Sequence, residues 1–139
     1  MKISELEKYG LPVEYLELLR ERGIYELNPV QVEAIKRGVL SGKNMVISTP
    51  TASGKTLVAE MLLVKRALEG KIGVYLTPLK ALASEKHREF SRLGGLGLNV
   101  GISTGDYDQP SEYLGEYNII VATYERFDSI MRLQPLWLS

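Results

Sequence analysis

Residues 48–56, with the sequence STPTASGKT, carry the groups that a phosphate-binding loop needs. Gly54 leaves room for the backbone to approach a β-phosphate. Lys55 has the reach for the β- and γ-phosphates, and the Thr56 hydroxyl can complete a magnesium shell. The strict pattern G-x-x-x-x-G-K-[ST] requires glycine where this chain has Thr49. A polar turn that happens to contain Gly-Lys-Thr is therefore the alternative.

The flanking sequence favours the phosphate loop. An apolar run at 44–48 predicts a buried strand before it, and 56–68 predicts a helix with apolar residues on nearly every side after it. That strand–loop–helix context is what the motif requires. We therefore expect Lys55 and Thr56 to be catalytic, and Thr56 to bind the metal. The loop residues predicted to bind the cofactor are Thr49, Pro50, Thr51, Ala52, Ser53, Gly54, Lys55 and Thr56.

The composition limits the other kinds of site. The chain has 139 residues, enough for about one domain, and 17 basic residues balance 17 acidic ones. Bulk positive charge therefore cannot hold nucleic acid, although a local groove could. No cysteine is present and His87 is the sole histidine, which excludes disulfides and histidine–thiolate metal sites. Because no signal core or membrane-length apolar run occurs, we expect a soluble, cytoplasmic protein.

Strands and helices alternate along the rest of the chain. We expect helices at 12–22, from Asn28 onward, and at 79–93 and 124–132, and strands at 73–77, 98–103 and 117–123. Continuously apolar strands predict a parallel α/β sheet with helices on both faces. Ligands bind such sheets at the carboxyl ends of the strands, where Ser48, Thr77, Ser103 and Thr123 stand.

Four further stretches carry a family resemblance. They are LNPVQ (27–31), TPLKALASEK (77–86), STGDYD (103–108) and ATYERFDS (122–129). In this order they resemble superfamily-two helicases of the DExH type, and most closely the archaeal Hjm DNA helicases, relatives of the Ski and polymerase-theta helicase domains. The resemblance runs from about Gly23 to Trp137. It implies a P-loop NTPase with a RecA-like sheet: residues 1–139 as part of the first motor domain, with 1–27 as an N-terminal helical lead-in.

Gln31 has two interpretations. By the resemblance it belongs to the Q motif, where its amide would match the N7 acceptor and N6 donor of adenine. By spacing alone, Asn28 and Gln31 form a capping box, in which Gln31 reaches back to the N-cap N–H. The family resemblance favours the adenine role.

The other three stretches resemble the helicase motifs that contact single-stranded nucleic acid. Lys80 and the helix N-terminus beside it suit phosphates, although a solvated helix face would have similar charges. Asp106 and Asp108 are interpreted as part of a solvated acidic loop rather than a metal site, and His87 as a surface residue. The residues that the resemblance places in the nucleic-acid channel are Pro78, Leu79, Lys80, Thr104, Gly105, Thr123 and Arg126.

The acidic D-E pair of a DExH box does not occur in the sequence. We therefore expect a fragment that binds ATP and Mg²⁺ but hydrolyses negligible ATP alone. The resemblance implies a parent that is an ATP-dependent 3′–5′ DNA helicase in DNA repair and fork processing, acting on single-stranded or forked DNA. The sequence does not reveal the oligomeric state, and we expect a monomer. The alternatives are a Ski-type RNA helicase, a small P-loop kinase and a non-catalytic nucleotide-binding module.

Overall fold

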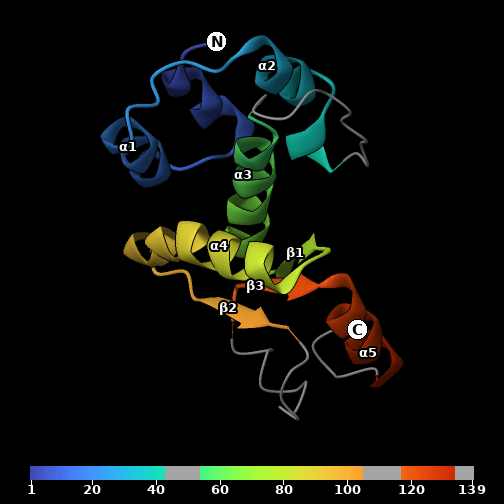
Figure 1. Cartoon of the computed structure of the whole chain (residues 1–139). Coiled ribbons are helices and arrows are strands. Elements are labelled where there is room, and N and C mark those ends of the chain that lie inside the picture. Colours follow the sequence, from blue (N-terminus) through green and yellow to red (C-terminus); the bar gives the residue numbers. More distant parts are fainter. Residues whose placement is uncertain (43–53, 105–116, 134–139) are drawn as a thin grey trace. The chain divides into compact units, whose positions relative to one another are not determined.

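The computed structural model describes residues 1–42, 54–104 and 117–133 (Figure 1). The strand predicted at 44–48, most of the predicted phosphate loop, and Gly105, Asp106 and Asp108 lie outside the described residues. The chain divides into two compact units, Met1–Lys65 and Arg66–Ser139, which are treated separately below.

The first unit is helical. It contains the 3₁₀ helix η1 (Ile3–Tyr9), α1 (Val13–Glu21), α2 (Pro29–Lys36), the 3₁₀ turn η2 (Val39–Ser41) and most of α3 (Lys55–Leu68). In α1, Leu16 and Leu19 are buried as their helical spacing predicts, but Val13 is 44% exposed. Tyr15 is buried instead of Val13. The Tyr15 hydroxyl can be buried because it donates a hydrogen bond to the buried carboxylate of Glu60 in α3, at 2.6 Å.

The helix predicted from Asn28 onward is shorter than the sequence pattern indicates. Asn28 is the N-cap, as expected, and Pro29 is the first helical residue. The helix α2 ends at Lys36, and Gly38 then adopts a φ of +97°, which breaks the helix before η2. The apolar residues Val39 and Leu40 are nevertheless buried, so they join the core from a turn.

The helix α3 matches its prediction closely. It begins at Lys55 and ends at Leu68, and it buries Leu57, Val58, Met61, Leu63, Val64 and Ala67 on several sides. Its 14 residues are too few to cross a bilayer. None of the helices in the described part of the chain has both the length and the apolar character of a membrane span.

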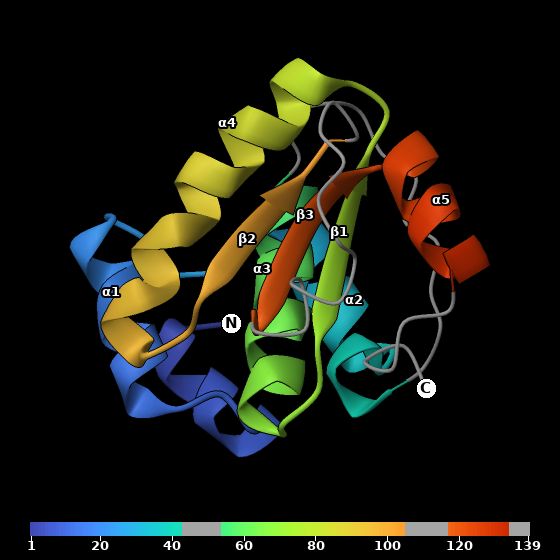
Figure 2. The same cartoon turned by 90° about the horizontal axis from the view of Figure 1, so that it is seen from below.

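Among its described residues, the second unit contains a three-stranded parallel sheet, shown face-on in Figure 2. The strands β1 (Gly73–Thr77), β2 (Val100–Ser103) and β3 (Ile119–Thr123) lie in the order β1-β3-β2. The central strand β3 is buried at every position, which explains its unbroken apolar sequence. Strand β1 has the predicted bounds, and its last residue, Thr77, is level with Thr123 of β3.

Two helices cover opposite faces of this sheet. On one face, Tyr75 of β1 meets Phe90 of α4 (Lys80–Phe90) edge to face, with ring centroids 5.1 Å apart. Tyr75 is level with Val121, so the side chains of Ile120 and Ala122 point to the other face. There they pack with Phe127 of α5 (Tyr124–Leu133). The predicted parallel sheet with helices on both faces is therefore confirmed.

The residues after α4 depart from the prediction. The helix expected at 79–93 ends at Phe90 and continues as the 3₁₀ helix η3 (Ser91–Leu96). His87 is half-buried, and its Nε2 lies 3.0 Å from the carbonyl oxygen of Val100. The prediction of a plain surface histidine was wrong, because this side chain joins α4 to the start of β2.

Gly101 of β2 has no room for a side chain. A Cβ built there would lie 2.7 Å from two atoms of the Tyr117 ring. We expect Gly101→Ala to lower the free energy of unfolding by about 1–3 kcal/mol, since the ring must move out of a packed site. Thermal or urea unfolding measures this. Gly95→Ala is the control, because nothing lies within 4 Å of its Cβ position; an equal loss in both variants would contradict the packing explanation.

Candidate nucleotide site and nucleic-acid interface

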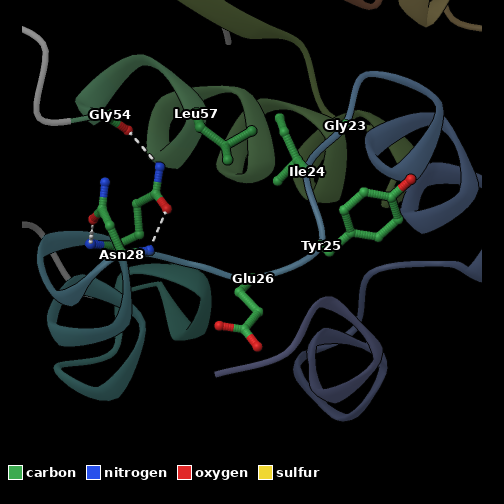
Figure 3. Close-up of a pocket in the computed structure, with 8 residues that line it drawn as sticks. Gly23, Ile24, Tyr25, Glu26, Asn28, Gly54 and Leu57 are labelled. Atoms are coloured by element: carbon green, nitrogen blue, oxygen red, sulfur yellow. Dashed lines mark hydrogen bonds between the residues drawn. The ribbon is translucent and has the colours of Figure 1, made fainter.

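An open pocket of about 610 Å³ lies in the first unit (Figure 3). Its size falls in the range of small-ligand sites, about 300–1,000 Å³. It lies where the chain enters α2 and where α3 begins. The residues that line it are Gly23, Ile24, Tyr25, Glu26, Asn28, Gln31, Gly54 and Leu57.

Gln31 forms the capping box at one end of this pocket. Its backbone N–H donates to Asn28 Oδ1, and its own Oε1 accepts from the Asn28 N–H, both at 2.9 Å. The predicted capping box of Asn28 and Gln31 is thus confirmed. The reciprocal bonds fix the side-chain torsions of Gln31, which is only 6% exposed.

The same amide also contacts the end of the predicted phosphate loop. Gln31 Nε2 donates to the Gly54 carbonyl oxygen at 3.2 Å, as drawn in Figure 3. A primary amide has two N–H donors and two acceptor lone pairs. In its contacts with the described residues, the Gln31 amide uses one N–H donor and one acceptor lone pair. The remaining donor and acceptor are the pair that adenine N7 and N6 require, so capping does not preclude adenine binding.

Gly54 is a glycine for two physical reasons. Its φ is +82°, a left-handed conformation that side chains disfavour. A Cβ there would lie 2.4 Å from Gln31 Nε2 and 2.8 Å from Asn28 Nδ2. The backbone therefore passes directly against the two polar side chains that begin α2.

Lys55 and Thr56 occupy the first turn of α3, immediately after Gly54. Both are half-buried. The N–H groups of a first turn have no partners within their helix, and the helix dipole adds positive potential there. This position suits an anion, and the Thr56 hydroxyl is a suitable oxygen ligand for Mg²⁺. The other predicted loop residues, 49–53, lie outside the described residues.

The pocket includes residues that were not predicted from the sequence. Ile24 and Leu57 supply apolar surface, and Tyr25 is 63% exposed at its edge. Gly23 was identified only as the start of the family resemblance. For Gly23, Ile24 and Tyr25 the available signal was their position just before the LNPVQ stretch, because the walls of a pocket around Gln31 must include neighbouring residues of the chain. For Leu57 it was the position directly after the predicted phosphate loop.

Three of the residues predicted to contact nucleic acid are exposed together in the second unit. Pro78, Leu79 and Lys80 follow β1 and begin α4, and Leu79 is 61% exposed. Leu79 is the N-cap, and no side chain caps α4 within the described residues. The backbone N–H groups of its first turn are thus placed to bind a phosphate. Farther along α4, Lys86 is paired with Glu89 at 3.1 Å.

The ends of β2 and β3 are joined by Arg126. Its Nε donates to Ser103 Oγ at 2.8 Å, and its backbone N–H donates to Thr123 Oγ1 at 3.3 Å. Thr123 and Ser103 are buried, and Thr104 is half-buried beside them. The structure thus brings Thr104, Thr123 and Arg126 to one edge of the sheet. It also gives Thr123 a structural role, the N-terminal capping of α5.

Known proteins resemble the chain over its whole length. It is 53% identical over 140 residues to the ATP-dependent DNA helicase Hel308 of Thermococcus kodakarensis, covering 100% of this chain and 12% of that protein. The Hel308 of Pyrococcus abyssi is 51% identical over 99% of this chain and 19% of that protein. The chain therefore spans less than a fifth of the length of these relatives.

The fold also matches solved helicase structures. The DUF1998 helicase MrfA superposes with a TM-score of 0.71 at 28% identity, over 86% of this chain and 20% of MrfA. A hypothetical ATP-dependent RNA helicase from Sulfolobus tokodaii has a TM-score of 0.69 at 23% identity, over 88% of this chain and 37% of its own, and shows the fold alone. Residues 28–138 match the DEAD/DEAH box helicase family. The chain belongs to the DEAD/DEAH box helicase family.

Proposed function

We propose that this chain is the nucleotide-binding part of the first motor domain of an ATP-dependent 3′–5′ DNA helicase. The observation that supports this most is the bond from Gln31 to the Gly54 carbonyl, at 3.2 Å. It joins the pocket to a helix that begins with Lys55 and Thr56. Adenine would contact the spare donor and acceptor of Gln31 and the apolar surface of Leu57.

The phosphates and the metal would bind at the start of α3. Lys55 would contact the β- and γ-phosphates and stabilise the charge that develops during phosphoryl transfer. Thr56 would hold Mg²⁺, which neutralises charge on the phosphate oxygens when it is bound. The Asp-Glu pair that completes such a site in this family is absent from the 139 residues. Turnover therefore requires carboxylates from outside this segment.

The second unit would bind the backbone of a single strand of DNA. Pro78, Leu79 and Lys80 present an exposed helix N-terminus to the phosphate backbone, and Thr104, Gly105, Thr123 and Arg126 would extend the same surface. Contacts of this kind bind the backbone without reading sequence. The Hel308 relatives are named as DNA helicases. We therefore favour single-stranded or forked DNA, and a role in fork processing and repair, over RNA.

The DNA assignment is tested with the full-length protein that contains this segment. We expect single-stranded DNA to stimulate its ATP hydrolysis more strongly than RNA of the same sequence. Lys80→Ala should weaken DNA binding at every sequence and make it less dependent on salt. Stronger stimulation by RNA would instead support the Ski-type RNA helicase.

The adenine role of Gln31 makes a separate prediction. The protein should bind ADP about tenfold more tightly than IDP, because the hypoxanthine O6 cannot donate to Gln31 Oε1. Gln31→Met should remove this preference. Calorimetric titration with both nucleotides measures it. Glu33→Ala is the matched control on α2, since it removes only the exposed ion pair with Arg37 at 2.6 Å. An unchanged preference in Gln31→Met would leave the glutamine with its capping role alone.

A further inference from the structure

A buried carboxylate lies in the helix that follows the predicted phosphate loop. Glu60 of α3 is 1% exposed. The Tyr15 hydroxyl donates to its Oε2 at 2.6 Å. Arg22 Nη1 donates to Oε2 at 2.9 Å and to Oε1 at 3.2 Å. All three residues belong to the first unit, Met1–Lys65. The negative charge of Glu60 is thus held and balanced by one arginine.

The partners of Glu60 come from the N-terminal lead-in. Tyr15 lies within α1, and Arg22 directly follows it as its C-cap. The match to the helicase family begins only at residue 28. Glu60 therefore lies within the matched residues, whereas Tyr15 and Arg22 lie before them. The positive charge that contacts Glu60 thus comes from the N-terminal lead-in.

Glu60 is close to the start of its helix. It lies five residues after Lys55, a rise of about 7.5 Å along the axis. It also follows Leu57, which lines the pocket, by three residues, so both side chains project from one side of α3. A carboxylate at this distance repels a polyanion at the helix N-terminus. Because Glu60 is buried, salt screens that repulsion less than it would at the surface.

We propose that Arg22 is an affinity-setting residue: it cancels the charge of Glu60 and so permits tight binding of nucleotide phosphates at the start of α3. Tyr15 is the positioning residue that keeps the carboxylate turned toward Arg22. This inference rests on the proposed function, namely that a nucleotide binds with its phosphates at that helix end. It predicts an effect that depends on the charge of the ligand.

The test compares ADP with adenosine, which lacks phosphates, by calorimetric titration of the full-length protein. Arg22→Met should weaken ADP binding about three- to tenfold in 0.1 M salt and leave adenosine binding unchanged. Glu60→Gln should have the opposite effect and tighten ADP binding by a similar factor. The double variant should return the ADP-to-adenosine affinity ratio to near that of the wild type.

The controls are Arg37→Met and Glu33→Gln, which make the same charge changes at an exposed pair of the same unit. Both should leave the affinity ratio unchanged. A purely structural network predicts that Arg22→Met and Glu60→Gln both weaken both ligands, and that result would overturn the proposal. If Arg22→Met does not fold, the Glu60→Gln variant provides the test by itself. Weaker ADP binding by Glu60→Gln than by the wild type would contradict the proposal. Failure of the wild type to bind either ligand would instead refute the nucleotide site itself.

Discussion

Replacing Lys55 by alanine should abolish ATP-dependent unwinding by the full-length protein. The residue stands in the first turn of α3, directly after Gly54, where its ammonium group can reach the phosphates. Loss of one group that stabilises transition-state charge costs about 10²–10³-fold in kcat. Steady-state ATP hydrolysis in the presence of single-stranded DNA measures this loss.

Lys36→Ala is the control for that experiment. Lys36 is an exposed lysine in the last turn of α2, outside the lining of the pocket. Lys36 carries the same charge as Lys55, and the Lys36→Ala variant should hydrolyse ATP at the wild-type rate. Near-normal hydrolysis by Lys55→Ala, with Lys36→Ala also normal, would mean that the start of α3 does not hold the phosphates.

Replacing Gly54 by alanine should both destabilise the protein and weaken nucleotide binding. The left-handed backbone alone makes alanine less favourable by about 1–2 kcal/mol. The new methyl group would lie 2.4 Å from Gln31 Nε2. Moving that amide away from the Gly54 carbonyl adds about 1–3 kcal/mol. Chemical unfolding and ADP titration measure the two effects.

Gly70→Ala separates backbone strain from crowding. Gly70 has a φ of +84°, and nothing lies within 4 Å of its Cβ position. The Gly70→Ala variant should lose only the stability that backbone strain costs, and its nucleotide affinity should be unchanged. The difference between the two variants then gives the energy of the contact between Gly54 and Gln31. Equal losses of stability and normal ADP binding in both would show that this contact has no role in the site.

Local sequence patterns predicted most of the second unit. Strand β1 has its predicted bounds because Gly73 and Thr77 limit a continuous apolar run. His87 was misjudged because its hydrogen bond to the Val100 carbonyl joins residues 13 positions apart. Nothing in the charged sequence around His87 indicates that acceptor. Contacts between elements of this kind are decided by tertiary packing, which periodicity does not describe.

The candidate site could be predicted from the sequence only in part, because tertiary packing also decides which distant residues meet there. Gln31, Gly54, Lys55 and Thr56 are recognisable because their types and spacing are specific. The two interpretations of Gln31 proved compatible, since one amide has enough donors and acceptors for both. Tyr15 and Arg22 were not predicted because their partner, Glu60, is 45 and 38 residues away. Family membership decides against the small P-loop kinase.

The most direct test of the central claim is a crystal structure of the protein with ADP and Mg²⁺. We predict a diphosphate against the backbone of Gly54, Lys55 and Thr56, with the adenine edge hydrogen-bonded to the Gln31 amide. A structure in which the start of α3 is closed to the diphosphate, or in which the base binds away from Gln31, would contradict the account.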